Sequence, residues 1–172
     1  LPILPSIAAG EAMISYGLSE REAGSDAAAL ACKAVATGDD YVISGTKAWI
    51  THGGLADFYN LFARTGEGSK GISCFLVPSD TDGLTFGKPE EKMGLHSIPT
   101  TSAHYDDAFV PAERLIGDEG RGLQIAFSAL DSGRLGIAAV AVGIAQGIRQ
   151  SLVSGITADA VTAPKAVGGA GK

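Results

Sequence analysis

Residues 38–54 read GDDYVISGTKAWITHGG, and this stretch decides the class of fold. A Gly-Asp-Asp turn comes first, and short runs of Tyr, Val, Ile, Thr and Trp follow it, which are residues that favour strands. Gly45 interrupts the run and predicts a kink between two strands, at 41–44 and 47–51. The stretch therefore predicts a turn that leads into extended, interrupted β structure rather than into a helix.

The same pattern extends on both sides of this stretch, from Ile14 to about Phe109. Runs rich in Val, Ile, Tyr, Phe and Thr alternate with Gly, Asp, Asn and Ser, and Pro78 and Pro111 stand where strands should stop. Because no long helical pattern separates the runs, we expect an antiparallel β-barrel or a sandwich of two packed sheets. The other predicted strands are 14–18, 31–37, 57–64, 72–77, 84–87 and 102–109.

The hydrophobic period changes after Gly122. From there to Leu152, apolar residues recur three and four positions apart, which predicts a helix, and Asp118 and Glu119 precede it where negative charge suits the helix dipole. Apolar and small residues occupy both faces, a pattern typical of a helix buried between other elements. The sequence shows no later helix to cover it, so we expect a long helix of an incomplete helical-bundle domain.

The chain is thus expected to have four segments. Residues 1–13 read as an entry segment, 14–117 as a mainly β domain with α structure after it, and 118–152 as the helix. Residues 153–172 form an atypical tail without a clear period.

Composition excludes several classes of protein. The chain has 172 residues, of which 45% are hydrophobic and 19% charged, which is too apolar for a disordered chain. A net charge of −6 argues against nucleic acid or an anionic membrane surface as the main partner. No uncharged apolar run reaches the ~18 residues of a membrane span. Cys32 and Cys74 lack metal-ligand spacing and are too few for a disulfide framework, so we expect a reducing, cytoplasmic location.

The first polar motif is YGLSEREAGSD, residues 16–26. A strand runs into a loop that contains Gly24, Ser25 and Asp26. Backbone N–H groups and hydroxyls in such a loop suit a phosphate or the polar edge of a heteroaromatic ring. An ordinary turn with an Asp cap explains the same residues.

The second motif is KAWITHGG, residues 47–54. Its Trp49 could cover a ring system, and the hydroxyl or amide of Thr51 could bond a ring nitrogen. A core tryptophan followed by a turn is the alternative.

The third motif, LDSGR at 130–134, lies in the predicted helix. Asp131 and Arg134 are three residues apart and share a helix face, as in a surface ion pair. Because the surrounding helix is apolar, we expect the pair instead to be buried against partners or to line a polar ligand channel.

Taken in order, these stretches resemble the acyl-CoA dehydrogenase family of flavoenzymes. The resemblance covers about residues 1–150. The further matching stretches are KGISCFLVP (70–78), GKPEEKMGLHSIPT (87–100), FVPAERLIGDEGRG (109–122) and LDSGRLGIAAVAVGIAQ (130–146). The resemblance implies a subunit with an N-terminal helical domain, a middle β domain of two packed sheets and a C-terminal four-helix domain. This chain would supply the middle domain and the first helix of the third.

The resemblance also implies a cofactor, FAD, and roles for individual residues. The flavin site would comprise Tyr16, Leu18, Ser19, Gly24, Ser25, Trp49, Ile50 and Thr51. The substrate, an acyl-CoA, would contact Ser25, Asp131 and Arg134. The implied electron acceptor is an electron-transfer flavoprotein, and the implied assembly is a homo-oligomer.

The catalytic base is the residue that the resemblance does not supply. Some relatives carry a carboxylate just before the arginine of the matching helix, and here that position is Gly133, which cannot act as a base. Three hypotheses follow: a truncated or fragmentary FAD-dependent acyl-CoA dehydrogenase, a non-catalytic flavin- or CoA-binding or oligomerisation module, and an acyl-CoA oxidase-like flavoenzyme.

Overall fold

The computed structural model describes the backbone of residues 3–162 and the side chains of residues 3–155. The chain divides into two compact units, Leu1–Ser128 and Ala129–Lys172, which we describe separately. The elements are α1 (Leu4–Ala9), β1 (Ile14–Gly17), a 3-10 helix (Ala27–Ala29), β2 (Lys33–Thr37), β3 (Asp40–Thr51), β4 (Phe58–Arg64), β5 (Ile72–Pro78), β6 (Leu84–Phe86), β7 (Thr100–Val110), a second 3-10 helix (Ala112–Arg114), β8 (Leu115–Ile116) and α2 (Gly122–Thr162).

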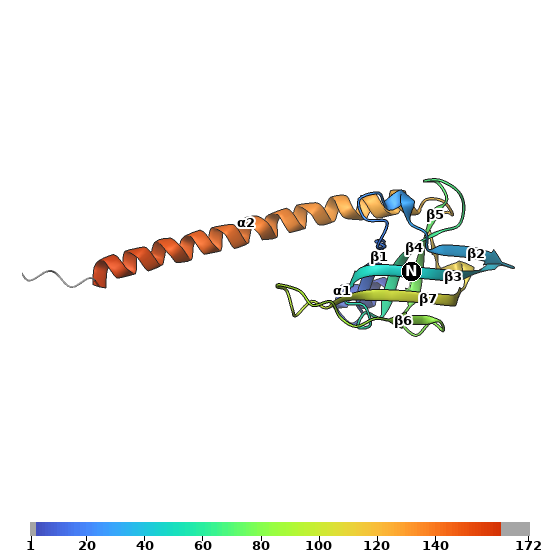
Figure 1. The fold of residues 1–172 in the computed structure, drawn as a ribbon, viewed down its shortest axis with the longest axis horizontal. Coiled ribbons are helices and arrows are strands. Elements are labelled where there is room, and N and C mark those ends of the chain that lie inside the picture. The colour runs from blue at the N-terminus through green and yellow to red at the C-terminus, as the bar shows by residue number, and fades with distance from the viewer. Residues whose placement is uncertain (1–2, 163–172) are drawn as a thin grey trace, which may run out of the picture. The chain divides into compact units, whose positions relative to one another are not determined.

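The strands form one sheet in the order β6-β7-β3-β2-β4-β5-β8, and β1 pairs with β4 (Figure 1). Most pairs are antiparallel, but β1 and β2 both run parallel to β4, and β2 joins β4 through the single pair Lys33–Arg64. The end strands β6 and β8 do not pair with each other in the described residues, so the sheet is open and the closed barrel, one of the two predicted forms, is wrong.

The two halves of this sheet nevertheless pack against each other across one core. Tyr41 of β3 meets Phe75 of β5 with ring centroids 4.9 Å apart, and Tyr59 of β4 meets Phe86 of β6 at 5.1 Å. Tyr59 and Phe75 are fully buried. The prediction of two packed β layers is thus confirmed, with the layers belonging to one sheet joined at the β2–β4 pair.

Strand β3 is continuous where the sequence predicted two strands. Its pairing with β7 shifts register between Ile43 and Gly45, so the predicted kink is a β-bulge inside one strand. A Cβ at Gly45 would lie only 2.7 Å from Cα of Cys32, which explains why glycine is needed there. The predicted turn before β3 is a two-residue hairpin closed by the Thr37–Asp40 pair.

Two short elements were not expected. Strand β8 has two residues and pairs with β5, and α1 has six residues, none of them buried. Elements this short carry no detectable hydrophobic period, so residues 1–13 read only as a connection.

Helix α2 continues to Thr162, ten residues beyond the predicted end at Leu152. Every described side chain from 131 to 155 is exposed in the structure. By length and composition alone, its stretch Gly122–Gly155 could cross a membrane, a test that the core helices of soluble bundles also pass. The sequence prediction of no membrane span rested on uninterrupted uncharged runs, whereas this stretch includes Asp131 and Arg134. Residues 163–172 of the predicted tail lie outside the described part.

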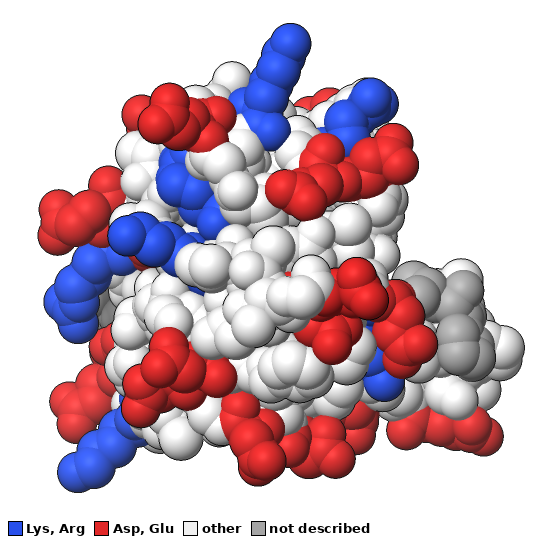
Figure 2. Space-filling model, turned by 90° about the vertical axis from the view of Figure 1, so that its right-hand side faces the viewer, with Lys and Arg blue, Asp and Glu red and all other residues white. Residues whose placement is uncertain are grey.

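Figure 2 shows acidic side chains scattered over one face, with basic side chains between them rather than gathered at one place. This arrangement agrees with the net charge of −6 and gives no continuous basic surface on that face for a phosphate backbone.

Candidate functional site

The end of β3 carries a second bulge that aims a large aromatic side chain outward. The pairing with β7 shifts register between Lys47 and Ile50, and Trp49 inside the bulge has φ of +58° and is 51% exposed. Left-handed backbone is rare for a bulky residue and costs of order 1–3 kcal/mol, and such strain concentrates at functional sites. The alternative of a core tryptophan is therefore wrong.

This bulge is tied directly to the loop that follows β1. The N–H of Ala48 donates to the carbonyl of Ser19 at 2.9 Å, and the Ser15 hydroxyl donates to the carbonyl of Thr51 at 2.5 Å. These bonds join residues 29 and 36 positions apart in the sequence, so the first motif and the strand end before it form one structure with the second motif. The side chain of Thr51 lies at the surface beside this junction.

A buried ion pair forms the third link between the motifs. The Lys47 ammonium, which is fully buried, lies 2.7 Å from Oε1 of Glu20 and also donates to the carbonyl of Leu18 at 3.1 Å. Burial lowers the pKa of Lys47, with Cys32 and Glu20 acting in the opposite direction. Burial also raises the pKa of Glu20, but hydrogen bonds from Lys47 and backbone N–H groups outweigh it, so that pKa lies below its ordinary value. Glu20 is thus a structural carboxylate.

The remaining residues of the predicted flavin site fall into two groups. Ser19, Gly24 and Ser25 are partly or fully exposed and are available to a ligand. Leu18 is buried, and Ile50 is 1% exposed and belongs to the hydrophobic core, so Ile50 can offer a ligand only its backbone.

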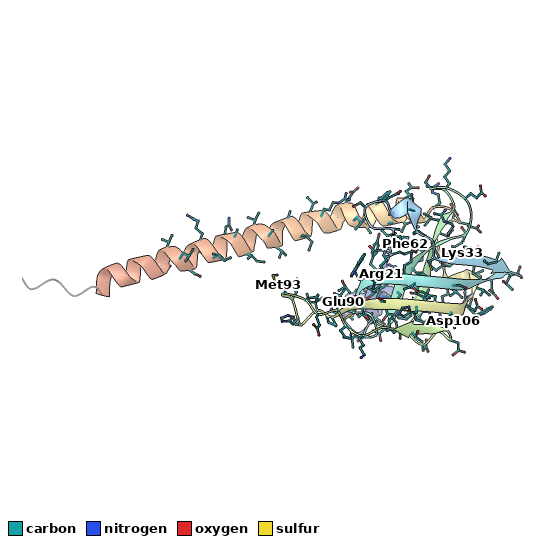
Figure 3. The ribbon with its side chains drawn as sticks, viewed as in Figure 1. Arg21, Lys33, Phe62, Glu90, Met93 and Asp106 are labelled. Carbon is teal, nitrogen blue, oxygen red and sulfur yellow. The ribbon has the colours of Figure 1, made fainter. Side chains whose placement is uncertain are left out.

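Tyr16 faces the start of α2 within the first unit. Its hydroxyl donates to the carbonyl of Ala126 at 3.1 Å, and its ring lies 5.0 Å from that of Phe62, which Figure 3 labels. Burial, with a smaller contribution from Cys74, raises the pKa of Tyr16 to about 12, so the phenol stays neutral. Tyr16 therefore connects the candidate site to the start of α2, and it also offers the site the edge of its ring.

Asp131 and Arg134 lie in the second unit. They form an exposed i,i+3 ion pair at 2.9 Å, with side chains 73% and 70% exposed. Within this chain the pair is therefore a surface ion pair, and its expected burial against partners or place in a ligand channel stays a prediction. No atom lies within 4 Å of a Cβ built at Gly133, so a larger side chain fits there.

One cavity touches both motifs, and another lies at the start of α2. The first, of about 250 Å3, is lined by Glu20, Thr46 and Ala48 among others. The second, of about 570 Å3, surrounds the start of α2, near Lys70 and Arg121, and none of its lining residues belongs to the two flavin motifs.

Sequence reasoning missed two polar residues. Lys92, interpreted as part of a solvated charge cluster, donates to the carbonyl of Leu95 at 3.0 Å and also to that of Ile98, so it organises the loop that carries Met93 (Figure 3). Asn60, paired in register with Tyr16, has a buried Oδ1 without a hydrogen-bond partner among the described residues. Neither feature has a sequence signal, because the Lys92 bonds depend on how the loop folds back and the burial of Asn60 depends on the sheet.

Residues 15–108 match the family model described as acyl-CoA dehydrogenase, middle domain. The chain is 47% identical over 146 residues to the short-chain-specific acyl-CoA dehydrogenase of Clostridium acetobutylicum, covering 84% of this chain and 38% of that protein. Among solved structures it resembles butyryl-CoA dehydrogenase from Megasphaera elsdenii, with a TM-score of 0.82 and 41% identity over 84% of this chain and 39% of that one. A glutaryl-CoA dehydrogenase from Mycobacterium smegmatis, solved in complex with FADH2, gives a TM-score of 0.61 and 38% identity, covering 65% and 28%.

The chain therefore spans about two fifths of the length of the first two relatives. The match to the middle-domain model covers more than half of the chain. This chain belongs to the acyl-CoA dehydrogenase family.

Proposed function

We propose that this chain is the flavin-binding part of an FAD-dependent acyl-CoA dehydrogenase, an oxidoreductase that introduces an α,β double bond into acyl-CoA thioesters in fatty-acid or amino-acid catabolism. The observation that carries the proposal is the junction of the two motifs. The bulge of Trp49 and the loop of Ser19 are joined by hydrogen bonds and by the Lys47–Glu20 pair.

The residues at this junction fit a flavin. A half-exposed indole held in a strained conformation offers a flat apolar surface for a ring system. Thr51 and Ser19 lie beside it and offer hydroxyl and backbone donors to the polar edge of such a ring. Ser25, in the exposed part of the same loop, is placed to reach cofactor or substrate.

The proposed reaction removes a weakly acidic α-proton from a thioester and a hydride from the neighbouring β-carbon. FAD, when bound, supplies the hydride acceptor. This chain's residues would hold and orient the ring: Trp49 by covering one face and Thr51 by donating a hydrogen bond to its edge. Proton removal needs a carboxylate within hydrogen-bond reach of Cα.

Among the described residues joined at the junction by the bonds given above, the one carboxylate is that of Glu20. Both oxygens of Glu20 accept backbone or ammonium hydrogen bonds, which leaves this buried carboxylate occupied. Asp131 is paired with Arg134, and Gly133 has no side chain. We therefore propose that this chain binds FAD but does not by itself dehydrogenate acyl-CoA.

The test is to titrate FAD with the purified 172-residue chain, following flavin fluorescence, and then to mix the complex anaerobically with straight-chain and branched acyl-CoAs. We expect binding without bleaching of the flavin. Failure to bind FAD contradicts the proposal and favours an oligomerisation module. Bleaching at an enzymatic rate contradicts the absence of a base, and rapid reoxidation by oxygen afterwards favours the oxidase-like alternative.

A second measurement tests the position of the base. Gly133→Glu places a carboxylate where some relatives carry one, and the space around Gly133 accepts it. Because Gly133 matches the position of the base in those relatives, we expect this variant to show slow, acyl-CoA-dependent flavin reduction. Gly133→Gln, which has the same shape without the charge, is the matched control and should remain inactive.

Three further assignments belong to the proposal. An electron-transfer flavoprotein is the proposed electron acceptor, and a homo-oligomer the proposed assembly, both from the family resemblance. A reducing, cytoplasmic compartment is proposed because Cys32 and Cys74 are free and buried. Burial raises their pKa values to about 11 and about 12, so both thiols stay protonated and unreactive at neutral pH.

A further inference from the structure

The first unit, Leu1–Ser128, is called the β unit below, and its most unusual buried group is the Lys47 ammonium. Lys47 is fully buried and stands one residue before Ala48, at the start of the bulge that turns Trp49 outward. Its Nζ atom donates to the carbonyl of Leu18 and to the carboxylate of Glu20. A single side chain of β3 therefore holds two residues of the loop after β1.

Glu20 extends the same connection to a third segment. Its Oε2 accepts from the N–H of Ala31 at 2.7 Å, and its Oε1 accepts from the N–H of Cys32 at 3.0 Å as well as from Lys47. The pair thus joins the loop, the segment before β2 and strand β3. Burying two charges costs several kcal/mol each in desolvation, and apolar residues of the same volume often stabilise a fold equally well. Stability alone therefore gives a weak reason for the pair.

The pair instead fixes the direction of the loop backbone. A peptide unit is planar and trans, so a Leu18 carbonyl that points to the ammonium forces the N–H of Ser19 to point the opposite way. The next carbonyl, that of Ser19, is held by the N–H of Ala48. Two successive peptide units of the loop are therefore set by β3. Bonding a carbonyl to a cation also polarises its amide, which makes the N–H of Ser19 a stronger donor.

We propose that Glu20 and Lys47 are positioning residues for the cofactor, which orient the backbone of Leu18 and Ser19 toward the flavin ring without touching it. This inference rests on the proposed function for its ligand. The inference adds to the proposed function that a buried ion pair, behind the binding surface, orients the binding loop.

The test compares the native chain with Glu20→Gln/Lys47→Met, which keeps the side-chain shapes and removes both charges. We expect the amide of Ala48 to lose hydrogen-exchange protection by about tenfold or more, as for loss of a buried hydrogen bond, while amides of β4 and β5 stay protected. FAD should bind about tenfold more weakly, and the visible absorption band of the bound flavin should shift.

Val77→Ala is the control for a purely structural effect. Val77 is fully buried in the core, away from the junction, so this variant lowers stability without touching the loop. When folded, it should keep both the flavin spectrum and the protection of Ala48. If the double variant does not fold, Lys47→Met alone removes the donor to the Leu18 carbonyl while Glu20 keeps its bonds from the N–H groups of Ala31 and Cys32, and it should show the same changes.

The possible outcomes separate the two proposals. If the native chain does not bind FAD, the proposed function fails, and the exchange of Ala48 still decides whether the pair orients the loop. If the native chain binds FAD and the charge-free variant keeps its affinity, spectrum and Ala48 protection, the positioning role is overturned. Changes of equal size in Val77→Ala also overturn it.

Discussion

The two units of this chain use apolar residues in opposite ways. In the β unit, side chains such as Ile43, Tyr59 and Phe75 are fully buried in one core. In the second unit, the described part of α2 exposes large apolar side chains all round, among them Leu135, Ile137, Val140, Val142, Ile144, Ile148 and Leu152.

This difference shows which unit is stabilised by its own core. A cooperative fold needs a shared core, and the β unit has one. An isolated helix is held only by its backbone hydrogen bonds and local propensity, and its stability in proteins comes mostly from packing. We therefore infer that the β unit specifies its own structure, whereas α2 is shaped to be covered by other helices.

The largest expected effect tests this contrast with one substitution at two places. Ile43→Ala removes a fully buried side chain and should lower the free energy of unfolding by about 2–5 kcal/mol. Ile144→Ala removes a side chain that is 59% exposed and should change it by less than about 0.5 kcal/mol. Denaturant unfolding at low protein concentration measures both. Equal losses would show that α2 belongs to the same core.

The next effect is on association. An exposed apolar surface larger than a few hundred Å2 is usually an interface, so the 172-residue chain should self-associate as its concentration rises. Ile137→Glu/Ile144→Glu places two charges seven residues apart on one helix face and should shift the chain toward monomer. Light scattering over a range of concentrations measures this. A native chain that stays monomeric at every concentration contradicts the inference that α2 seeks partners.

A smaller effect concerns strain within the β unit. Because Trp49 has φ of +58°, Trp49→Gly should be more stable than Trp49→Ala by roughly 1–2 kcal/mol, the cost of left-handed backbone for a residue with a Cβ. Val35 is an exposed residue of β2 without positive φ, and there Ala should be more stable than Gly by roughly 0.5–1 kcal/mol. Thermal or chemical unfolding of the four variants measures which of Gly and Ala is more stable at each position. If Trp49→Ala is more stable than Trp49→Gly, the backbone of Trp49 is not strained.

The parts of the fold that carry local signals were predictable. Strand-forming runs, the two-residue turn before Asp40 and the helical spacing after Gly122 each appear in consecutive residues. The joining of both layers into one sheet was not predictable, since it depends on the single Lys33–Arg64 pair between β2 and β4. Nor could residue pattern alone place α1, which is short and packs no core residue.

The candidate site was predictable in its members but not in its construction. Trp49 and Thr51 were named from family resemblance, while residue chemistry left a core tryptophan open. The strain of Trp49 and the burial of Lys47 become visible only when the loop after β1 meets the bulge of β3. Lysine is usually exposed, so no sequence rule would place Lys47 in the interior. The site therefore depends on long-range contacts that no local pattern encodes.

The smallest expected effect falls on Thr51, where the β unit meets its proposed ligand. Thr51→Val keeps the β-branched shape and removes one hydroxyl, and the Ser15 bond to the Thr51 carbonyl is unaffected because it uses the backbone. Since the side chain is exposed, unfolding should change little. FAD affinity should fall by about 0.5–1.5 kcal/mol, the net contribution of a neutral hydrogen bond, which a fluorescence titration resolves. Thr51→Ser keeps the hydroxyl and should retain most of the affinity. If Val and native chains bind FAD equally, the hydroxyl does not contact the flavin, and the role of Thr51 reduces to ending strand β3.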